Sequence, residues 1–163
     1  TLLIFFISLF IIVGGVEESH FLAYLGQFIV EFVQSDLLMA TILLMWVAAV
    51  MSAAIDNIPF TAAMIPILLS LETQGIDVTP LWWALALGVG MGGNGTHIGS
   101  TANVYIVTVS ERLAKKEGNP ALAITPLMWA KIGLPVMLIT LLICTFIMYF
   151  FFGFYSQPFE RIG

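Results

Sequence analysis

The chain has 163 residues, of which 60% are hydrophobic and 9% are charged, with a formal net charge of -5. Soluble domains average about 45–50% apolar and about 25% charged residues, so the composition excludes a soluble globular protein. It predicts a single all-α integral membrane domain over residues 1–163. The negative charge argues against a nucleic-acid partner, and the single cysteine excludes an internal disulfide.

Two helices are predicted before the first polar loop. Residues 1–16 are apolar and predict the end of a transmembrane helix. Because Thr1 already lies inside this apolar segment, we expect the chain to be the C-terminal part of a longer protein. Residues 19–35 show the i, i+3, i+4, i+7 spacing of an amphipathic helix lying at the membrane interface, with these apolar residues on one face: Phe21, Leu22, Leu25, Phe28, Ile29, Phe32 and Val33.

The next stretch, residues 37–71, contains one charge, Asp56. Pro59 lacks an N–H and disfavours helical geometry just before it, so a helix break is expected at 56–58. The arm over 59–71 would be about 20 Å long as a helix, too short for a bilayer core of about 30 Å. The stretch therefore predicts a re-entrant hairpin with the break at its tip, and two shortened spans are the alternative.

Five glycines lie between Gly88 and Gly95 in an uncharged stretch. A glycine inside a helix costs about 1 kcal/mol relative to alanine, so the cluster predicts a transmembrane helix over 80–111 that is broken at Asn94, Gly95 and Thr96. Non-helical backbone at membrane depth is tolerated only where it is buried in protein or lines a watery cavity. The break is therefore a candidate site.

The last transmembrane helix is predicted over 126–155, where the part from 132 to 155 has no charge. Arg112, Lys115 and Lys116 cluster in the loop expected after the broken helix. The positive-inside bias places that loop in the cytoplasm, so the hairpin opens to the outside. We expect an integral, multi-pass protein, in the cell membrane if the source is prokaryotic.

Asp56 is the only acid predicted inside the membrane. An ionised carboxylate there costs several kcal/mol unless it is paired or hydrated, which makes it a functional-site hypothesis. The alternative role is an ordinary N-cap of the second hairpin arm, because Asp commonly precedes a proline in the first helical turn. Both roles can hold at once.

Neutral oxygen donors accompany both predicted breaks: Asn57, Thr61, Asn94, Thr96, Ser100, Thr101 and Asn103. Paired half-helix ends offer positive dipoles to an anion and free carbonyls to Na+. We predict ion binding at Asn57, Asn94 and Thr96, with Na+ as the candidate ion. For Ser100 and Thr101, polar packing between helices is an equal alternative. No cofactor is expected apart from Na+ as a coupling ion.

His97 could titrate near physiological pH and take part in proton coupling, although a hydrogen-bonded core histidine is an equal alternative. No group of His, Cys and Glu has metal-ligand spacing. An intramembrane hydrolase would need a second acid or an activated serine beside Asp56 and His97, and the sequence offers neither. We therefore do not expect an enzyme.

The stretches Asp56–Pro66 and Gly92–Asn103 resemble the permease domain of melanosomal P proteins, arsenite permeases and NhaD-type Na+/H+ antiporters. They resemble more distantly the citrate and dicarboxylate symporters of the ion transporter superfamily. The resemblance implies two inverted repeats, each with an interfacial helix, a re-entrant hairpin and a broken transmembrane helix, of which this chain would be the second. It places at the hairpin tip and helix break the site residues Asp56, Asn57, Thr61, Gly93, Asn94, Gly95 and Thr96.

The function implied by the resemblance is secondary active transport of an ion, coupled to Na+ or H+, by alternating access in a homodimer. The implied partners are a small ion, the lipid bilayer, the N-terminal repeat of the same protein and a second copy. A Na+-coupled symporter of dicarboxylate, citrate or sulfate is the first alternative, although that branch usually has Ser-Asn-Thr where this chain has Asp56-Asn57. His97 also stands where an aliphatic residue is expected. A non-transporting membrane assembly subunit is the alternative of another class.

Overall fold

The computed structural model describes residues 33–157 and the separate positions 4, 7, 8, 11, 15 and 18. Regular structure in these residues is helical, without a strand. Of the predicted helix over 1–16 only positions 4, 7, 8, 11 and 15 are described, and most of the predicted helix over 19–35 lies outside the described part. From Leu37 onward the elements are α3 (Leu37–Ala54), α4 (Asn57–Thr73), α5 (Thr79–Gly92), α6 (Thr101–Glu117), the 3-10 helix η1 (Pro120–Leu122), α7 (Pro126–Phe150) and α8 (Phe152–Tyr155).

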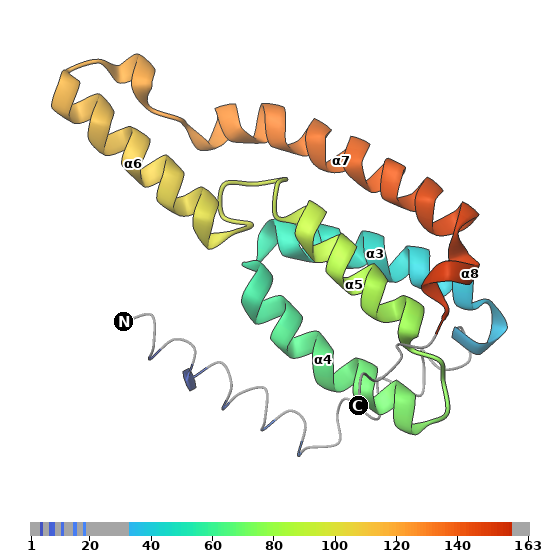
Figure 1. Cartoon of the computed structure of the whole chain (residues 1–163). Coiled ribbons are helices and arrows are strands. Elements are labelled where there is room, and N and C mark those ends of the chain that lie inside the picture. Colours follow the sequence, from blue (N-terminus) through green and yellow to red (C-terminus); the bar gives the residue numbers. More distant parts are fainter. Residues whose placement is uncertain are drawn as a thin grey trace.

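Helices α3 and α4 meet at one corner and diverge from it, as the two arms of a V (Figure 1). Helix α5 runs beside α3. Helix α7 lies along this pair on the side away from α4. Helix α6 projects away from the corner and returns through η1 to the start of α7. The interruption between α3 and α4 therefore lies beside the interruption between α5 and α6.

The contact between α3 and α5 uses small residues. Ala48 and Ala49 of α3 and Ala84 of α5 are completely buried. A Cβ added at Gly92 would lie 2.5 Å from the Cα of Ala49, and one added at Gly88 would lie 2.9 Å from the Cβ of Ala48. Small residues of this kind let helix backbones approach closely, and here they fix α5 against α3.

Among the residues that the structure describes, two helices are long and apolar enough to cross a membrane. They are α3, with 18 residues, and the 31-residue segment Pro120–Phe150 that includes α7. Helix α4 has 17 residues and is shorter than a typical span of about 20 residues. Large apolar side chains of α7 such as Ile132, Phe146 and Phe150 are exposed. This surface suits contact with lipid, in a protein that the composition already assigns to the membrane.

The hairpin break comes slightly earlier than predicted. Helix α3 ends at Ala54 and α4 begins at Asn57, because Asp56 is the N-cap of α4 and its carboxylate accepts from the N–H of Ile58 at 3.4 Å. Pro59 then lies in the first turn of α4, where a missing N–H costs no helical hydrogen bond. The second arm is consequently longer than an arm that begins at Pro59.

The segment predicted as a loop after the broken helix is helical instead. Helix α6 continues past residue 111 to Glu117, and Gly118 ends it in the left-handed conformation with φ 61°. Residues 111–117 contain strong helix formers, and Lys115 and Lys116 in the last turn complement the negative end of the helix dipole. The basic cluster therefore lies on a helix end rather than in a loop.

We expect Gly92→Ala to destabilise the fold by about 1–3 kcal/mol, because the added methyl overlaps the backbone of Ala49. Gly90→Ala on the same helix is the matched control. No atom lies within 4 Å of a Cβ added there, and alanine favours a helix by about 1 kcal/mol. Thermal unfolding in detergent should show a lower melting temperature for Gly92→Ala alone. Equal melting temperatures for the two variants would contradict the close packing of α3 on α5.

Candidate functional site

The corner between α3 and α4, which is the predicted hairpin tip, is in direct contact with the helix break between α5 and α6. Helix α5 ends at Gly92 and α6 begins at Thr101, which leaves residues 93–100 outside both helices. Within this loop the hydroxyl of Thr96 donates a hydrogen bond to the carbonyl oxygen of Ala53, in the last turn of α3. The end of α3, the start of α4 and the break thus form one polar cluster.

Asp56 lies at the beginning of two helices. Its Oδ1 caps the N-terminus of α4 through Ile58, and its Oδ2 accepts a hydrogen bond from the hydroxyl of Thr101, the first residue of α6. Helix N-termini carry a partial positive charge that stabilises an anion. The capping role and the position beside the helix break therefore occur together in this carboxylate.

Asn57 connects the hairpin tip to α3 and α5. Its Oδ1 accepts a hydrogen bond of 2.5 Å from the hydroxyl of Ser52, a completely buried residue of α3. A Cβ added at Gly93 would lie 2.8 Å from Oδ1 and 2.9 Å from Nδ2 of Asn57. The amide therefore rests on the backbone of the first residue of the break, and only glycine leaves room for it.

The backbone of the break is held from two sides. The Nδ2 of Asn103, on α6, donates to the carbonyl oxygens of Gly93 at 2.8 Å and of Thr96 at 3.2 Å. The Nε1 of Trp129, on α7, donates to the carbonyl oxygen of Asn94 at 3.1 Å. Asn103 thus uses its amide hydrogens to shape the loop, and its Oδ1 is the part of the side chain that could face an ion.

The remaining predicted residues are distributed around this cluster. Asn57 and Thr61 line a hollow of about 340 Å³ on α4, whereas Asn94 lines a different hollow of about 380 Å³ between the break and α7. Gly95 is buried, and His97 is half-buried in the loop. Ser100 is the N-cap of α6 and accepts from the N–H of Ala102 at 3.3 Å.

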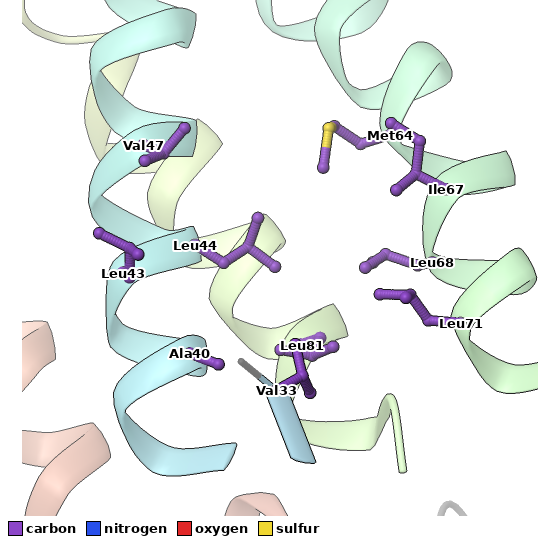
Figure 2. A pocket seen from close by; sticks show the side chains of 10 residues that line it. All are labelled: Val33, Ala40, Leu43, Leu44, Val47, Met64, Ile67, Leu68, Leu71 and Leu81. Carbon is purple, nitrogen blue, oxygen red and sulfur yellow. The ribbon is translucent and has the colours of Figure 1, made fainter. Parts of the chain in front are cut away.

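Helices α3 and α4 enclose a separate apolar groove of about 350 Å³ (Figure 2). Figure 2 shows side chains of α3 and α4 facing each other across it, among them Leu44, Met64 and Leu68. All ten lining residues are apolar. An ion would find no side-chain ligand here, so the groove is not part of the polar cluster.

The sequence alone does not identify Ser52 as a member of the cluster, and it leaves the role of Thr101 open. Ser52 has the appearance of a small packing residue inside a long apolar helix, and Thr101 fitted polar helix packing equally well. Their partners, Asn57 for Ser52 and Asp56 for Thr101, become visible only when the two breaks are brought together. A buried hydroxyl one helical turn before a predicted break is the signal that could have identified Ser52.

Loss of the Asn103 amide is expected to loosen the break. In Asn103→Ala the carbonyls of Gly93 and Thr96 lose their side-chain donor, at a cost of about 1–3 kcal/mol. Asn94→Ala is the control, since that side chain is exposed and its backbone carbonyl keeps the bond from Trp129. Hydrogen exchange of residues 93–100 should accelerate in Asn103→Ala only, and unchanged exchange would contradict this role.

Comparison with known proteins identifies the relatives of the chain. The family model described as citrate transporter matches residues 1–88, which is more than half of the 163 residues. The matched part includes α3 and α4 and ends within α5. No solved structure is significantly similar to the chain.

Curated relatives include P proteins, uncharacterized transporters and a membrane protein. The P protein of Sus scrofa is 42% identical over 118 residues, which are 68% of this chain and 14% of that protein. An uncharacterized transporter of Synechocystis is 30% identical over 158 residues, 86% of this chain and 34% of that protein. The 46 kDa membrane protein of Mycobacterium leprae is 36% identical over 121 residues, 72% of this chain and 27% of that protein. The chain thus spans between about a seventh and a third of their length.

Proposed function

Because the chain belongs to the citrate transporter family, we propose that it supplies one half of a secondary active transporter whose transport is coupled to Na+ or H+. The curated relatives that carry the name transporter support the general activity. The contact between the hairpin tip and the helix break supports the position of the site. In this proposal the ion binds where Asp56, Asn57 and Thr96 come together.

The architecture that we propose follows the family resemblance. In it α3 and α4 form the re-entrant hairpin, α5 and α6 form the broken helix, and α7 is the last span. This unit is the second of two inverted repeats, and its partners are the N-terminal repeat and a second copy of the protein. The V of α3 and α4 and the interruption at 93–100 support this assignment.

The observation that carries the choice of ion is the position of Asp56. Its carboxylate already occupies the positive ends of α4 and α6, through Ile58 and Thr101. The C-terminal ends of α3 and α5 bring carbonyl oxygens, such as that of Ala53, to the cluster that contains this carboxylate. A negative carboxylate beside carbonyl oxygens favours a cation or a proton, so cation/proton exchange is the function that this geometry supports best.

Sodium-coupled anion symport is the second candidate. The family model is described as citrate transporter, and an anion would also be attracted to the N-termini of α4 and α6. It would have to share them with Asp56, which already accepts from both helices. Repulsion between the anion and the negative carboxylate of Asp56 at the same helix ends disfavours anion binding.

In the proposed mechanism the site is exposed to one side of the membrane at a time. Asp56 supplies the charge that binds either Na+ or a proton, and oxygens of Asn57, Asn94, Thr96 and the loop carbonyls complete the coordination. Gly93 and Gly95 allow the backbone to approach the ion. Movement of the hairpin and the broken helix together then carries the occupied site across, as in other transporters built from discontinuous helices.

Asp56→Asn tests the role of the charge. Asparagine is as good an N-cap as aspartate, so the variant should fold while losing the ionisable group. In proteoliposomes of the full natural protein with an internal pH dye, addition of NaCl should produce a pH change in wild type and none in Asp56→Asn. Asp36→Asn is the matched control. Asp36 is also an N-cap and accepts from the N–H of Met39, but it lies at the start of α3, at the end of that helix opposite to Asp56.

Each outcome decides between the candidates. A normal Na+ response in Asp56→Asn contradicts the role of Asp56. An absent response in wild type contradicts cation/proton exchange and directs the assay to fluxes of dicarboxylates, sulfate and arsenite. If none of these anions moves either, the assembly subunit becomes the better account.

A further inference from the structure

The hydroxyl of Ser52 faces two acceptors with one hydrogen. The Oδ1 of Asn57 lies 2.5 Å from Ser52 Oγ, and the carbonyl oxygen of Val89, on α5, lies 3.0 Å from the same atom. A serine hydroxyl is a single donor, so it can make a full hydrogen bond to only one of them at a time. Ser52 is completely buried, which leaves no bulk water to supply the second bond.

The two acceptors differ in how they are satisfied without Ser52. The carbonyl oxygen of Val89 also accepts the backbone N–H of Gly93 at 3.1 Å. The Oδ1 of Asn57 lies at the hairpin tip, close to the break, where an ion is proposed to bind. When the Ser52 hydrogen turns to Val89, Oδ1 of Asn57 can give its lone pairs to a cation. When the site holds no cation, the hydroxyl satisfies Oδ1 instead.

We infer that Ser52 is a positioning residue of the ion site, whose hydroxyl turns between Asn57 Oδ1 and the Val89 carbonyl as the ion leaves and enters. The inference rests on the proposed function and adds a residue to it. In both states the buried hydroxyl keeps one acceptor, so ion binding leaves no buried donor unpaired, which would be costly.

The same helix offers a matched control that tests whether the role of Ser52 is purely structural. Thr41 of α3 is also completely buried, but its hydroxyl donates to the carbonyl oxygen of Leu37, 2.7 Å away in its own helix. Removal of this hydroxyl in Thr41→Val affects packing and stability without a contact at the hairpin tip. A change that appears in Ser52 variants and not in Thr41→Val therefore reports on the ion site.

The experiment compares wild type, Ser52→Ala, Ser52→Thr and Thr41→Val of the full natural protein. It measures the half-saturating Na+ concentration for the pH change in proteoliposomes, and the Na+-dependent rise of the melting temperature in detergent. We expect Ser52→Ala to lower the half-saturating Na+ concentration by up to about tenfold, the equivalent of one hydrogen bond, with a smaller change in maximal rate. The empty site then leaves Asn57 Oδ1 without its donor, whereas the Val89 carbonyl keeps the N–H of Gly93 when Na+ is bound. Ser52→Thr should restore the wild-type value, and Thr41→Val should keep it.

Two results overturn the inference while the proposed function stands. They are a Na+-responsive wild type with an unchanged or raised half-saturating concentration in Ser52→Ala, and an equal shift in Thr41→Val. A wild type without any Na+ response overturns the proposed function and this inference with it. If Ser52→Ala does not fold, Ser52→Cys takes its place, because its weaker S–H donor should lower the half-saturating Na+ concentration in the same direction.

Discussion

Free backbone groups at interrupted helices are the constraint on which this structure depends. Each helix end leaves up to four N–H or C=O groups without a helical partner, and bare groups cost several kcal/mol each in lipid. The described chain satisfies many of them across the two breaks: Asp56 and Ser100 cap α4 and α6, Thr96 reaches α3, and Asn103 holds the loop. The need to satisfy these groups draws the hairpin tip and the helix break into one cluster.

Packing of α3 against α5 provides the frame for that cluster. Glycine and alanine at the contact allow the backbones to approach, and a methyl group at Gly92 would already overlap Ala49. The same approach brings the carbonyl of Val89 to within 3.0 Å of Ser52 Oγ. Polar groups of α3, α5 and the hairpin tip therefore meet because small side chains let them. The geometry of the proposed site is thus a consequence of helix packing and depends little on long side chains.

The sequence predicts local features well and the contacts between them poorly. The glycine cluster and Pro59 each identify an interruption, because glycine and proline disrupt helices wherever they occur. The capping role of Asp56 also follows from local chemistry, and the structure bears it out. The partners Ser52 and Thr101, and the support of the break by Trp129, depend on which helices pack together. Helix α6 is longer than predicted, because the charged residues of its last turns favour a helix over the loop expected there.

The central claim is that the hairpin tip and the helix break bind one and the same ion, and protection from cysteine labelling tests it most directly. Ile58, in the first turn of α4, and Ile98, in the break, are half-exposed, with 50% and 48% of their surface accessible. Ile58→Cys and Ile98→Cys, each in a background free of other cysteines, are labelled with a maleimide at increasing Na+ concentration in the full natural protein. We expect Na+ to slow labelling at both positions with the same half-saturating concentration, and to have no effect when Asp56→Asn is added. Protection at only one position, or at two different Na+ concentrations, would contradict a single shared site.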